Sequence, residues 1–329
     1  MIGELVSDKA ARTAEFKRRN ARFVAKTINE SQLKVFEEQG WEFVANLKSG
    51  PKVRKTKSHD EILENDFWAI LYHFGYKSLN AGRKFTIEVT QHGGKSIRKQ
   101  IDVFAYDDET IIVAECKSAG DRRKWSLQKD LGEFEANKKP IARALAASLG
   151  DPLTKKIIWL FVTRNIEWAQ NDRARAAEFN IRVITEREMR YFSEIAKRLG
   201  PSARFQFQAE YLAKTKIPAL KDVTVPALKT KLGGTWAYFF VAPPRKILPI
   251  AFVNHRDLRD PETAPSYQRL ITRQRLQGVA KFVKEGGYFA NALLLNFKAP
   301  VNFDRAAPET PDGTTLGTLT LPNTYKSVW

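Results

Sequence analysis

The sequence predicts an α/β protein in which helices flank a mixed sheet, with a helical N-terminal leader and a second, smaller α+β domain. The chain has 329 residues, which is longer than one typical domain. Its middle part alternates helical periodicity with short apolar runs, the pattern of helices layered on a sheet. A Lys- and Pro-containing stretch, 214–226, follows it. We therefore expect a leader over 1–59, a central domain over 60–200 and a last domain over 201–329.

The charge of the chain predicts a polyanionic partner, with nucleic acid as the first candidate. Lys and Arg number 55 against 37 Asp and Glu, which gives a net charge of +18, and half of this excess lies in residues 201–329. The single cysteine, Cys116, excludes an intrachain disulfide and a Cys-rich zinc site. No secretory signal is visible, and the longest apolar run, 157–162, is too short to span a bilayer. We expect a cytoplasmic protein without membrane contact.

The leader is expected to be basic and helical. Residues 8–27 place Phe16 and Phe23 on a weak apolar stripe beside a cluster of Lys and Arg. A second short helix, 31–39, is expected to end at Gly40, because glycine suits a helix C-cap. The Gly- and Pro-punctuated stretch 48–57 is expected to be a loop.

The central domain is expected to have the order α-β-β-β-α-β-α-β-α. Asp60 is a plausible N-cap for its first helix, which the apolar pattern carries to Gly75. The expected elements are helices over 60–74, 127–149, 168–179 and 186–199, and strands over 85–89, 101–107, 110–117, 157–163 and 181–185. In the last domain we expect strands over 235–241, 247–253 and 292–297 and an amphipathic helix over 267–284.

Two of these strands form a hairpin that carries the candidate chemistry. If Asp107 faces Thr110 across the turn, Asp102 stands directly opposite Glu115, with Cβ atoms roughly 5 Å apart. Lys117 lies two residues beyond Glu115 and shares its face. Two carboxylates on an apolar strand pair repel each other and lose hydration, and a hard divalent cation such as Mg²⁺ relieves both costs. The competing interpretation is an ordinary hairpin end with a solvated cluster of charges.

This constellation resembles the PD-(D/E)XK nuclease superfamily over residues 60–200. Asp102 matches the acid of the family motif, and Glu115-Cys116-Lys117 matches its E-x-K. The resemblance implies that Asp102, Glu115 and the Cys116 carbonyl bind Mg²⁺, with Mn²⁺ as a substitute, and that Lys117 positions the hydrolytic water. It also implies an acid on the first core helix, for which Glu64 is our choice and Glu61 and Asp66 are alternatives. The residue before Asp102 is Ile101 rather than the proline of the family name.

Basic residues flank the hairpin on both sides and suit phosphate contacts that position a duplex without reading its sequence. The candidate DNA-binding residues are Arg98, Lys99, Arg122, Arg123, Lys124 and Lys129. A solvated charged surface is the competing interpretation for each of them.

The last third resembles the opening of DGQHR-domain proteins, a group that includes DndB-type proteins of DNA phosphorothioation systems and is similar to the ParB/sulfiredoxin-like fold. The residues that carry this resemblance are 250–256, 267–269, 274–276, 286–289 and 291–296. The Asp-Gly-Gln-His-Arg box is absent, and the sequence ends about where the family continues into it, so no nucleotide-dependent activity is expected here.

Together these features predict a Mg²⁺-dependent DNA endonuclease, a hydrolase that leaves 5′-phosphate ends. The resemblances imply a prokaryotic setting of phage defence, restriction or DNA modification, with a homodimer or defence-system proteins as partners. The alternative is a non-catalytic DNA-binding regulator of a phosphorothioation-type modification system. RNA is a further candidate substrate, because the hairpin chemistry does not select the sugar.

Overall fold

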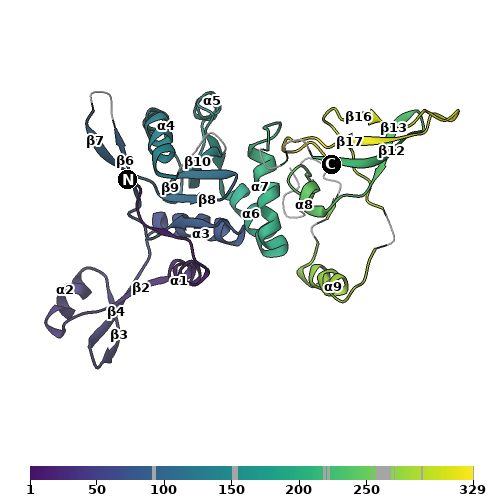
Figure 1. Ribbon diagram of the computed structural model, residues 1–329. Coiled ribbons are helices and arrows are strands. Elements are labelled where there is room, and N and C mark those ends of the chain that lie inside the picture. The colour runs from purple at the N-terminus through teal and green to yellow at the C-terminus, as the bar shows by residue number, and fades with distance from the viewer. Residues whose placement is uncertain are drawn as a thin grey trace. The chain divides into compact units, whose positions relative to one another are not determined.

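The computed structural model describes residues 1–90, 94–149, 155–217, 220, 223–253, 255–256, 268–269, 271–289 and 292–328. The chain divides into two compact units (Figure 1). The first comprises Met1–Tyr72 and Tyr76–Met189, and the second comprises His73–Gly75 and Arg190–Trp329. No helix among the described residues is long and apolar enough to cross a membrane.

The first unit is built on a six-stranded mixed sheet, as the sequence predicts. Its strand order is β1-β5-β8-β9-β10-β11. The strands are β1 (Leu5–Val6), β5 (Ser78–Asn80), β8 (Val103–Tyr106), β9 (Thr110–Lys124), β10 (Lys156–Glu167) and β11 (Arg182–Ile184). β9, β10 and β11 run parallel, whereas β1, β5 and β8 pair antiparallel with their neighbours. The antiparallel β8–β9 hairpin therefore feeds directly into the parallel half of the sheet.

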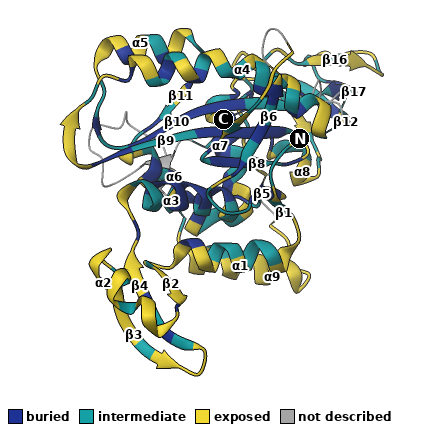
Figure 2. Ribbon diagram, turned by 90° about the vertical axis from the view of Figure 1, so that its left-hand side faces the viewer, coloured by how far each residue is buried: buried dark blue, intermediate teal, exposed yellow. Residues whose placement is uncertain are grey.

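Helices cover both faces of this sheet, α4 and α5 on one side and α3 with α1 on the other (Figure 1). Their bounds are α1 (Lys9–Asn20), α3 (His59–His73), α4 (Gln128–Leu149) and α5 (Gln170–Glu178). Burial on both faces explains why the central strands are almost continuously apolar rather than alternating. Figure 2 shows the central strands as largely buried, whereas α5 outside them carries many exposed residues.

The core on the α4 side fixes which face the hairpin presents to that helix. Ile111 and Val113 of β9 pack there with Leu131 and Phe134 of α4. Because side chains alternate along a strand, Glu115 and Lys117 continue the row that begins with Ile111 and Val113. The alternation of side chains along β9 and the packing of the core thus place Glu115 and Lys117 on the α4 side of the sheet.

The N-terminal region is only partly helical, which corrects two sequence-based expectations. The helix expected over 8–27 ends at Asn20, and β2 (Phe23–Thr27) follows it. The expected loop over 48–57 is mostly β4 (Gly50–Thr56), which pairs with β2 and with β3 (Glu42–Leu47). Cross-strand pairing overrides the local Gly and Pro signals here. Only η1 (Glu30–Gln32) and α2 (Leu33–Glu38) interrupt this largely exposed three-stranded sheet (Figure 2).

A separate hairpin precedes the candidate site. The expected strand 85–89 is β6 (Thr86–Thr90), which pairs with β7 (Ser96–Gln100) rather than with the six-stranded sheet. Ile87 and Val89 of β6 are buried in the α4-side core, so this hairpin packs against the helix. The chain then reaches Asp102 directly from β7, which places the end of this hairpin beside the candidate site.

The second unit contains a four-stranded sheet of order β13-β12-β17-β16 and several helices. Its elements are α6 (Glu186–Leu199), which begins in the first unit, η2 (Gly200–Ser202), α7 (Ala203–Tyr211), β12 (Thr224–Leu232), β13 (Thr235–Phe240), α8 (Pro244–Ile247), β14 (His255–Arg256), β15 (Gln268–Arg269), α9 (Arg273–Lys284), β16 (Asn302–Arg305) and β17 (Thr315–Thr320).

Three expectations for this unit are wrong or only partly right. The stretch 247–253 is the end of α8 and irregular chain rather than a strand, and 292–297 contains one isolated bridge, from Phe297 to Val328. The helix expected from residue 267 begins at Arg273, where the Thr272 side chain accepts a hydrogen bond from the Arg275 N–H as an N-cap. Part of the segment that carries the DGQHR resemblance lies outside the described residues: Asn254, Tyr267 and Asn291.

Candidate active site

The β8–β9 hairpin has the register that the sequence predicts. Val103 pairs with Ala114 and Tyr106 with Ile111. The turn between them is closed locally, because the Asp107 carboxylate accepts hydrogen bonds from the N–H groups of Glu109 and Thr110 at 2.9 and 2.7 Å. Asp102 lies one residue before β8, so this register brings it opposite Glu115.

Asp102 and Glu115 are in direct contact through a hydrogen bond between their carboxyl groups. Asp102 Oδ2 also accepts a hydrogen bond from the Cys116 N–H at 2.8 Å, which ties it to β9. Burial raises the pKa of both groups, and for Glu115, whose pKa is raised well above its ordinary value, the Asp102 charge adds to the effect. The pair therefore holds a proton more tightly than two isolated carboxylates would.

Lys117 lies on the same face and is held by α4. Its ammonium group contacts Asp130 Oδ1 at 2.7 Å, and this hydrogen bond raises the pKa of Lys117. The same ammonium lies 5.9 Å from the centre of the Trp125 ring. Lys117 is therefore protonated at neutral pH and fixed between the strand, the helix and an indole.

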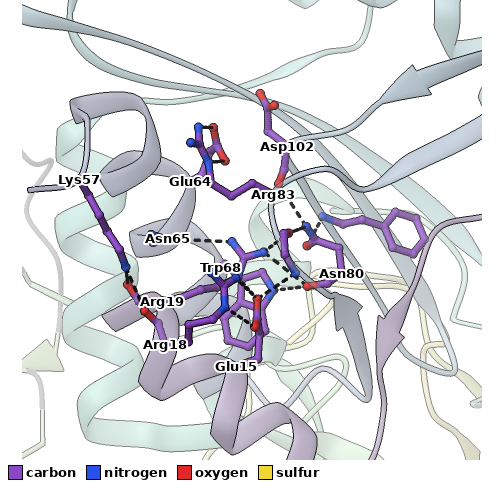
Figure 3. Close-up of polar contacts among 12 residues, drawn as sticks. Glu15, Arg18, Arg19, Lys57, Glu64, Asn65, Trp68, Asn80, Arg83 and Asp102 are labelled. Atoms are coloured by element: carbon purple, nitrogen blue, oxygen red, sulfur yellow. Dashed lines mark hydrogen bonds and ion pairs between the residues drawn. The ribbon is translucent and has the colours of Figure 1, made fainter. Parts of the chain in front are cut away.

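Glu64 comes from α3 and is committed to an arginine (Figure 3). Its two oxygens accept hydrogen bonds from Arg83 Nε at 2.7 Å and Nη2 at 2.6 Å, and its side chain is only 6% exposed. Burial raises the pKa of Glu64, and its charge raises that of Glu115, so it lies near the pair without joining it. Arg83 is thus the partner of the helix acid that the sequence-based expectation assigns to the metal.

The two alternative helix acids also have basic partners. Glu61 contacts Arg83 at 3.5 Å, and Asp66 contacts Arg164 at 2.7 Å. Within the described ranges, no group of three or more His, Cys, Asp or Glu side chains is arranged to hold a metal ion. The structure thus brings Asp102, Glu115 and Lys117 together, whereas each helix acid is paired with an arginine.

A buried network behind the hairpin positions Asp102 (Figure 3). Asn80 of β5 donates to the Asp102 carbonyl at 3.3 Å and accepts from the Phe104 N–H at 3.0 Å. Trp68 and Arg19 in turn donate to the Asn80 carbonyl, at 3.1 and 3.5 Å. Sequence reasoning missed Asn80, Arg83 and Arg19, because no motif or periodicity marks contacts between residues so far apart along the chain.

Arg19 is the most deeply buried charge of this network. Its guanidinium, with a side chain 0% exposed, lies 5.0 Å from the Trp68 ring centre and contacts Glu15 at 2.8 Å. It also donates to Asn65 and to the Gly82 carbonyl. The bonds from Arg18 and Arg19, together with the Gly82 N–H, lower the pKa of Glu15 to about 2 although burial opposes this. This network fastens α1 to α3 and to the end of β5.

The six candidate DNA-binding residues differ in their partners. Arg122 contacts Glu167 at 2.9 Å, Lys129 contacts Glu133 at 3.9 Å, and Arg123 lies 4.3 Å from the Trp125 ring centre. Arg98, Lys99 and Lys124 form no salt bridge with any residue that the structure describes. Five of the six are exposed, and Lys99 is half-buried.

The donor set of the hairpin suits a hard divalent cation. Two ionised carboxylates at this distance would repel each other, and a divalent cation could relieve that repulsion in place of the shared proton. The side chains that would bind Mg²⁺ are therefore Asp102 and Glu115. Cys116 is unsuited through its thiol, since burial raises its pKa well above the ordinary value, which leaves its backbone carbonyl as the candidate ligand.

Comparison with known proteins gives structural similarity only. No family model matches the chain, and no curated protein matches it. Protein VC1899 from Vibrio cholerae is similar with a TM-score of 0.30 and 12% identity over 57% of this chain and 50% of that one. Can2 from Sulfobacillus thermosulfidooxidans, solved in complex with cyclic tetra-adenylate, is similar with a TM-score of 0.29 and 12% identity over 59% and 56%. The chain spans about half the length of these structures, and similarity this low assigns no activity to it.

Proposed function

We propose that this protein is a Mg²⁺-dependent endonuclease of the PD-(D/E)XK type that hydrolyses phosphodiester bonds in DNA. The observation that carries the proposal is the hydrogen-bonded pair of Asp102 and Glu115 with Lys117 on the same face of the β8–β9 hairpin. A carboxylate pair without a cation is unfavourable in a half-buried site, so its presence favours a role in binding one.

Each residue of the site has a distinct role in this proposal. Asp102, Glu115 and the Cys116 carbonyl bind Mg²⁺, for which Mn²⁺ substitutes. Bound Mg²⁺ would supply Lewis acidity at the scissile phosphate. Lys117 orients the attacking water, and Asp130 holds its ammonium in place at 2.7 Å. The expected product is a 5′-phosphate end.

Glu64 can become a metal ligand only if its ion pair with Arg83 breaks. Its carboxylate is paired with Arg83 through two hydrogen bonds, so it joins the metal ligands only when Arg83 moves away. A DNA phosphate offers Arg83 an alternative bidentate partner, and substrate binding is therefore the event expected to release Glu64.

The wider setting of the protein remains a proposal drawn from the sequence. The basic residues around the hairpin would bind the DNA backbone, and the +18 charge favours such binding. The second unit, which resembles the opening of DGQHR-domain proteins, would bind DNA or a partner protein. The proposed context is prokaryotic phage defence or DNA modification, with a homodimer or defence-system proteins as the assembly.

Plasmid cleavage tests the proposal directly. Supercoiled plasmids of different modification status are incubated with the protein in Mg²⁺, in Mn²⁺ or in EDTA. We expect strand scission with either metal and none in EDTA, and at least a hundredfold slower scission by Asp102→Asn. The matched control is Glu38→Gln, which removes an exposed acid of α2. Equal scission by wild type and Asp102→Asn would refute the proposal.

A non-catalytic DNA-binding regulator is the second candidate. The pairing of Glu64 with Arg83 and of Lys117 with Asp130 favours it, because both side chains are already bound by protein partners. Such a regulator would bind DNA with a steep dependence on salt and would show no metal-dependent scission on any plasmid. An RNA strand in the same assay separates DNA cleavage from RNA cleavage.

A further inference from the structure

A cavity of about 540 Å³ lies where β9 and β10 end. Lys124 and Glu167, the last residues of the two strands, line it together with Trp125 and Trp168. Its volume lies in the range of small-molecule sites, roughly 300–1,000 Å³. The chemistry proposed above does not use this cavity.

The sequence builds the cavity from two equivalent connections. β9 and β10 run parallel and in register at their ends, where Glu167 pairs with Lys124. Each strand then enters a helix through a tryptophan, Trp125 before α4 and Trp168 before α5. The cavity therefore lies at the carboxyl ends of two adjacent parallel strands.

One buried carboxylate holds the two connections together. Asp172 of α5 accepts a hydrogen bond from the Leu127 N–H at 3.1 Å and another from Arg175 at 2.9 Å. Trp168 is fixed as well, because its Nε1–H donates to Thr163 at 2.9 Å and its ring packs edge-on against Phe161. These contacts hold Trp168 and the start of α4 in place beside the cavity.

The lining combines aromatic planes with amides. Two half-buried indoles line the cavity together with seven polar or charged side chains, among them the amides of Gln128 and Asn171. Indole rings and guanidinium planes stack nucleobases, and amides form hydrogen bonds with base edges. The guanidinium of Arg123 already lies 4.3 Å from the Trp125 ring centre, which adds a second plane of this kind.

The cavity adjoins the candidate active site through one residue. The Trp125 ring that lines it is also 5.9 Å from the Lys117 ammonium, which lies on the face of the carboxylate pair. A nucleotide with its base in the cavity would thus direct its phosphate toward Lys117. Enzymes that act on a base bind it outside the stack, and a single-stranded segment offers such a base at the lowest cost.

We propose that the cavity between Trp125 and Trp168 binds a single unstacked nucleobase. Its source is a DNA strand running past Lys117 or a free nucleotide, and the strand source rests on the function proposed above.

The test uses the 329-residue chain with Ca²⁺ in place of Mg²⁺. The probes are single-stranded DNA 12-mers with one 2-aminopurine at successive positions, and dAMP alone. We expect quenching of 2-aminopurine at one position on wild-type protein and loss of that signal with Trp125→Ala, together with about tenfold weaker binding by anisotropy. Trp125→Phe, which keeps an aromatic plane, should retain quenching. Trp236→Ala, which removes a lysine-contacting tryptophan of β13, is the control.

The outcomes separate this proposal from the endonuclease proposal. Quenching of 2-aminopurine that depends on Trp125 supports the base site even if no plasmid is cleaved. If dAMP alone quenches the protein fluorescence saturably, and Trp125→Ala loses this effect, the ligand is the free nucleotide. Equal 2-aminopurine signals and equal dAMP binding for wild type and a folded Trp125→Ala overturn the base site even if cleavage is intact. Circular dichroism establishes folding. If Trp125→Ala does not fold, the wild-type protein is titrated with the intact strand and with the same strand made abasic at the quenched position. Weaker binding of the abasic strand supports the base site, and equal affinity for the two strands overturns it.

Discussion

Asp102 and Glu115 share a hydrogen bond between their carboxyl groups at the entrance to β8. Such a bond requires a proton shared between the two groups, and burial raises the pKa of both. The N–H of Cys116 stabilises charge on Asp102 instead. The pair therefore behaves as one half-buried unit that binds either a proton or a cation.

Divalent cations should stabilise the fold through this unit. We expect Mg²⁺ or Ca²⁺ at about one hundred times the dissociation constant to raise the free energy of unfolding by about 2.7 kcal/mol, because only the folded chain brings the two carboxylates together. Urea unfolding at pH 7.5 with and without metal measures the effect. Glu115→Gln should abolish it, whereas Glu133→Gln, on the exposed face of α4, should not. An equal metal effect in both variants would contradict the assignment.

Replacement of Lys117 should slow the cleavage of DNA without weakening its binding. Lys117→Ala is expected to slow plasmid scission at least about a hundredfold, in line with the loss of a group that orients the nucleophilic water. DNA affinity in Ca²⁺ should change by less than about threefold, because the remaining basic residues still bind the backbone. The exposed Lys34 of α2 supplies the control Lys34→Ala. A parallel loss of affinity and rate would make Lys117 a DNA contact rather than part of the reaction.

The salt dependence of DNA binding should distinguish the basic side chains. Arg98 has no acidic partner within the described part of the chain, so Arg98→Gln should reduce the slope of log affinity against log salt by about 0.9. Arg122 contacts Glu167 at 2.9 Å, and its loss should reduce the slope less. Anisotropy titrations at several salt concentrations measure both. Equal slopes for the two variants would show that the ion pair does not govern the DNA contact.

Acid should weaken the α1 network through Glu15. The pKa of Glu15 is lowered to about 2, below the ordinary value of 4.5, so the folded state favours its ionised form. Its contribution is complete above pH 4.5 and is lost as the pH falls from 4.5 toward 2. After discounting for solvent screening, we expect about 1–2 kcal/mol.

Unfolding by urea between pH 2 and pH 7 measures this contribution. The difference in the free energy of unfolding between wild type and Glu15→Gln should shrink as the pH falls through this window. Glu38→Gln removes an exposed acid of α2 and should show no such convergence. If the difference in the free energy of unfolding stays constant down to pH 2, ionisation of Glu15 is not the source of the stabilisation.

The candidate hairpin was predictable because its causes are local. Asp107 closes the turn through hydrogen bonds to Glu109 and Thr110, and that closure sets every cross-strand pair up to Asp102 and Glu115. The pairing of Glu64 with Arg83 was not predictable, since no period relates the two positions. The strands β2 and β4 were not predicted, because their side chains are largely exposed and apolar and polar residues do not clearly alternate along them.

The sequence by itself determined the mixed sheet with its flanking helices and the register that brings two carboxyl groups together. Alternation of side chains and short-range turn chemistry act within a few residues, so the order of residues is enough. Only the tertiary structure decided that Arg83 pairs with the helix acid, that Asp130 holds Lys117 and that Trp125 and Trp168 line one cavity. Those contacts form when distant segments pack against each other, and packing depends on the shape of the whole core rather than on any local pattern.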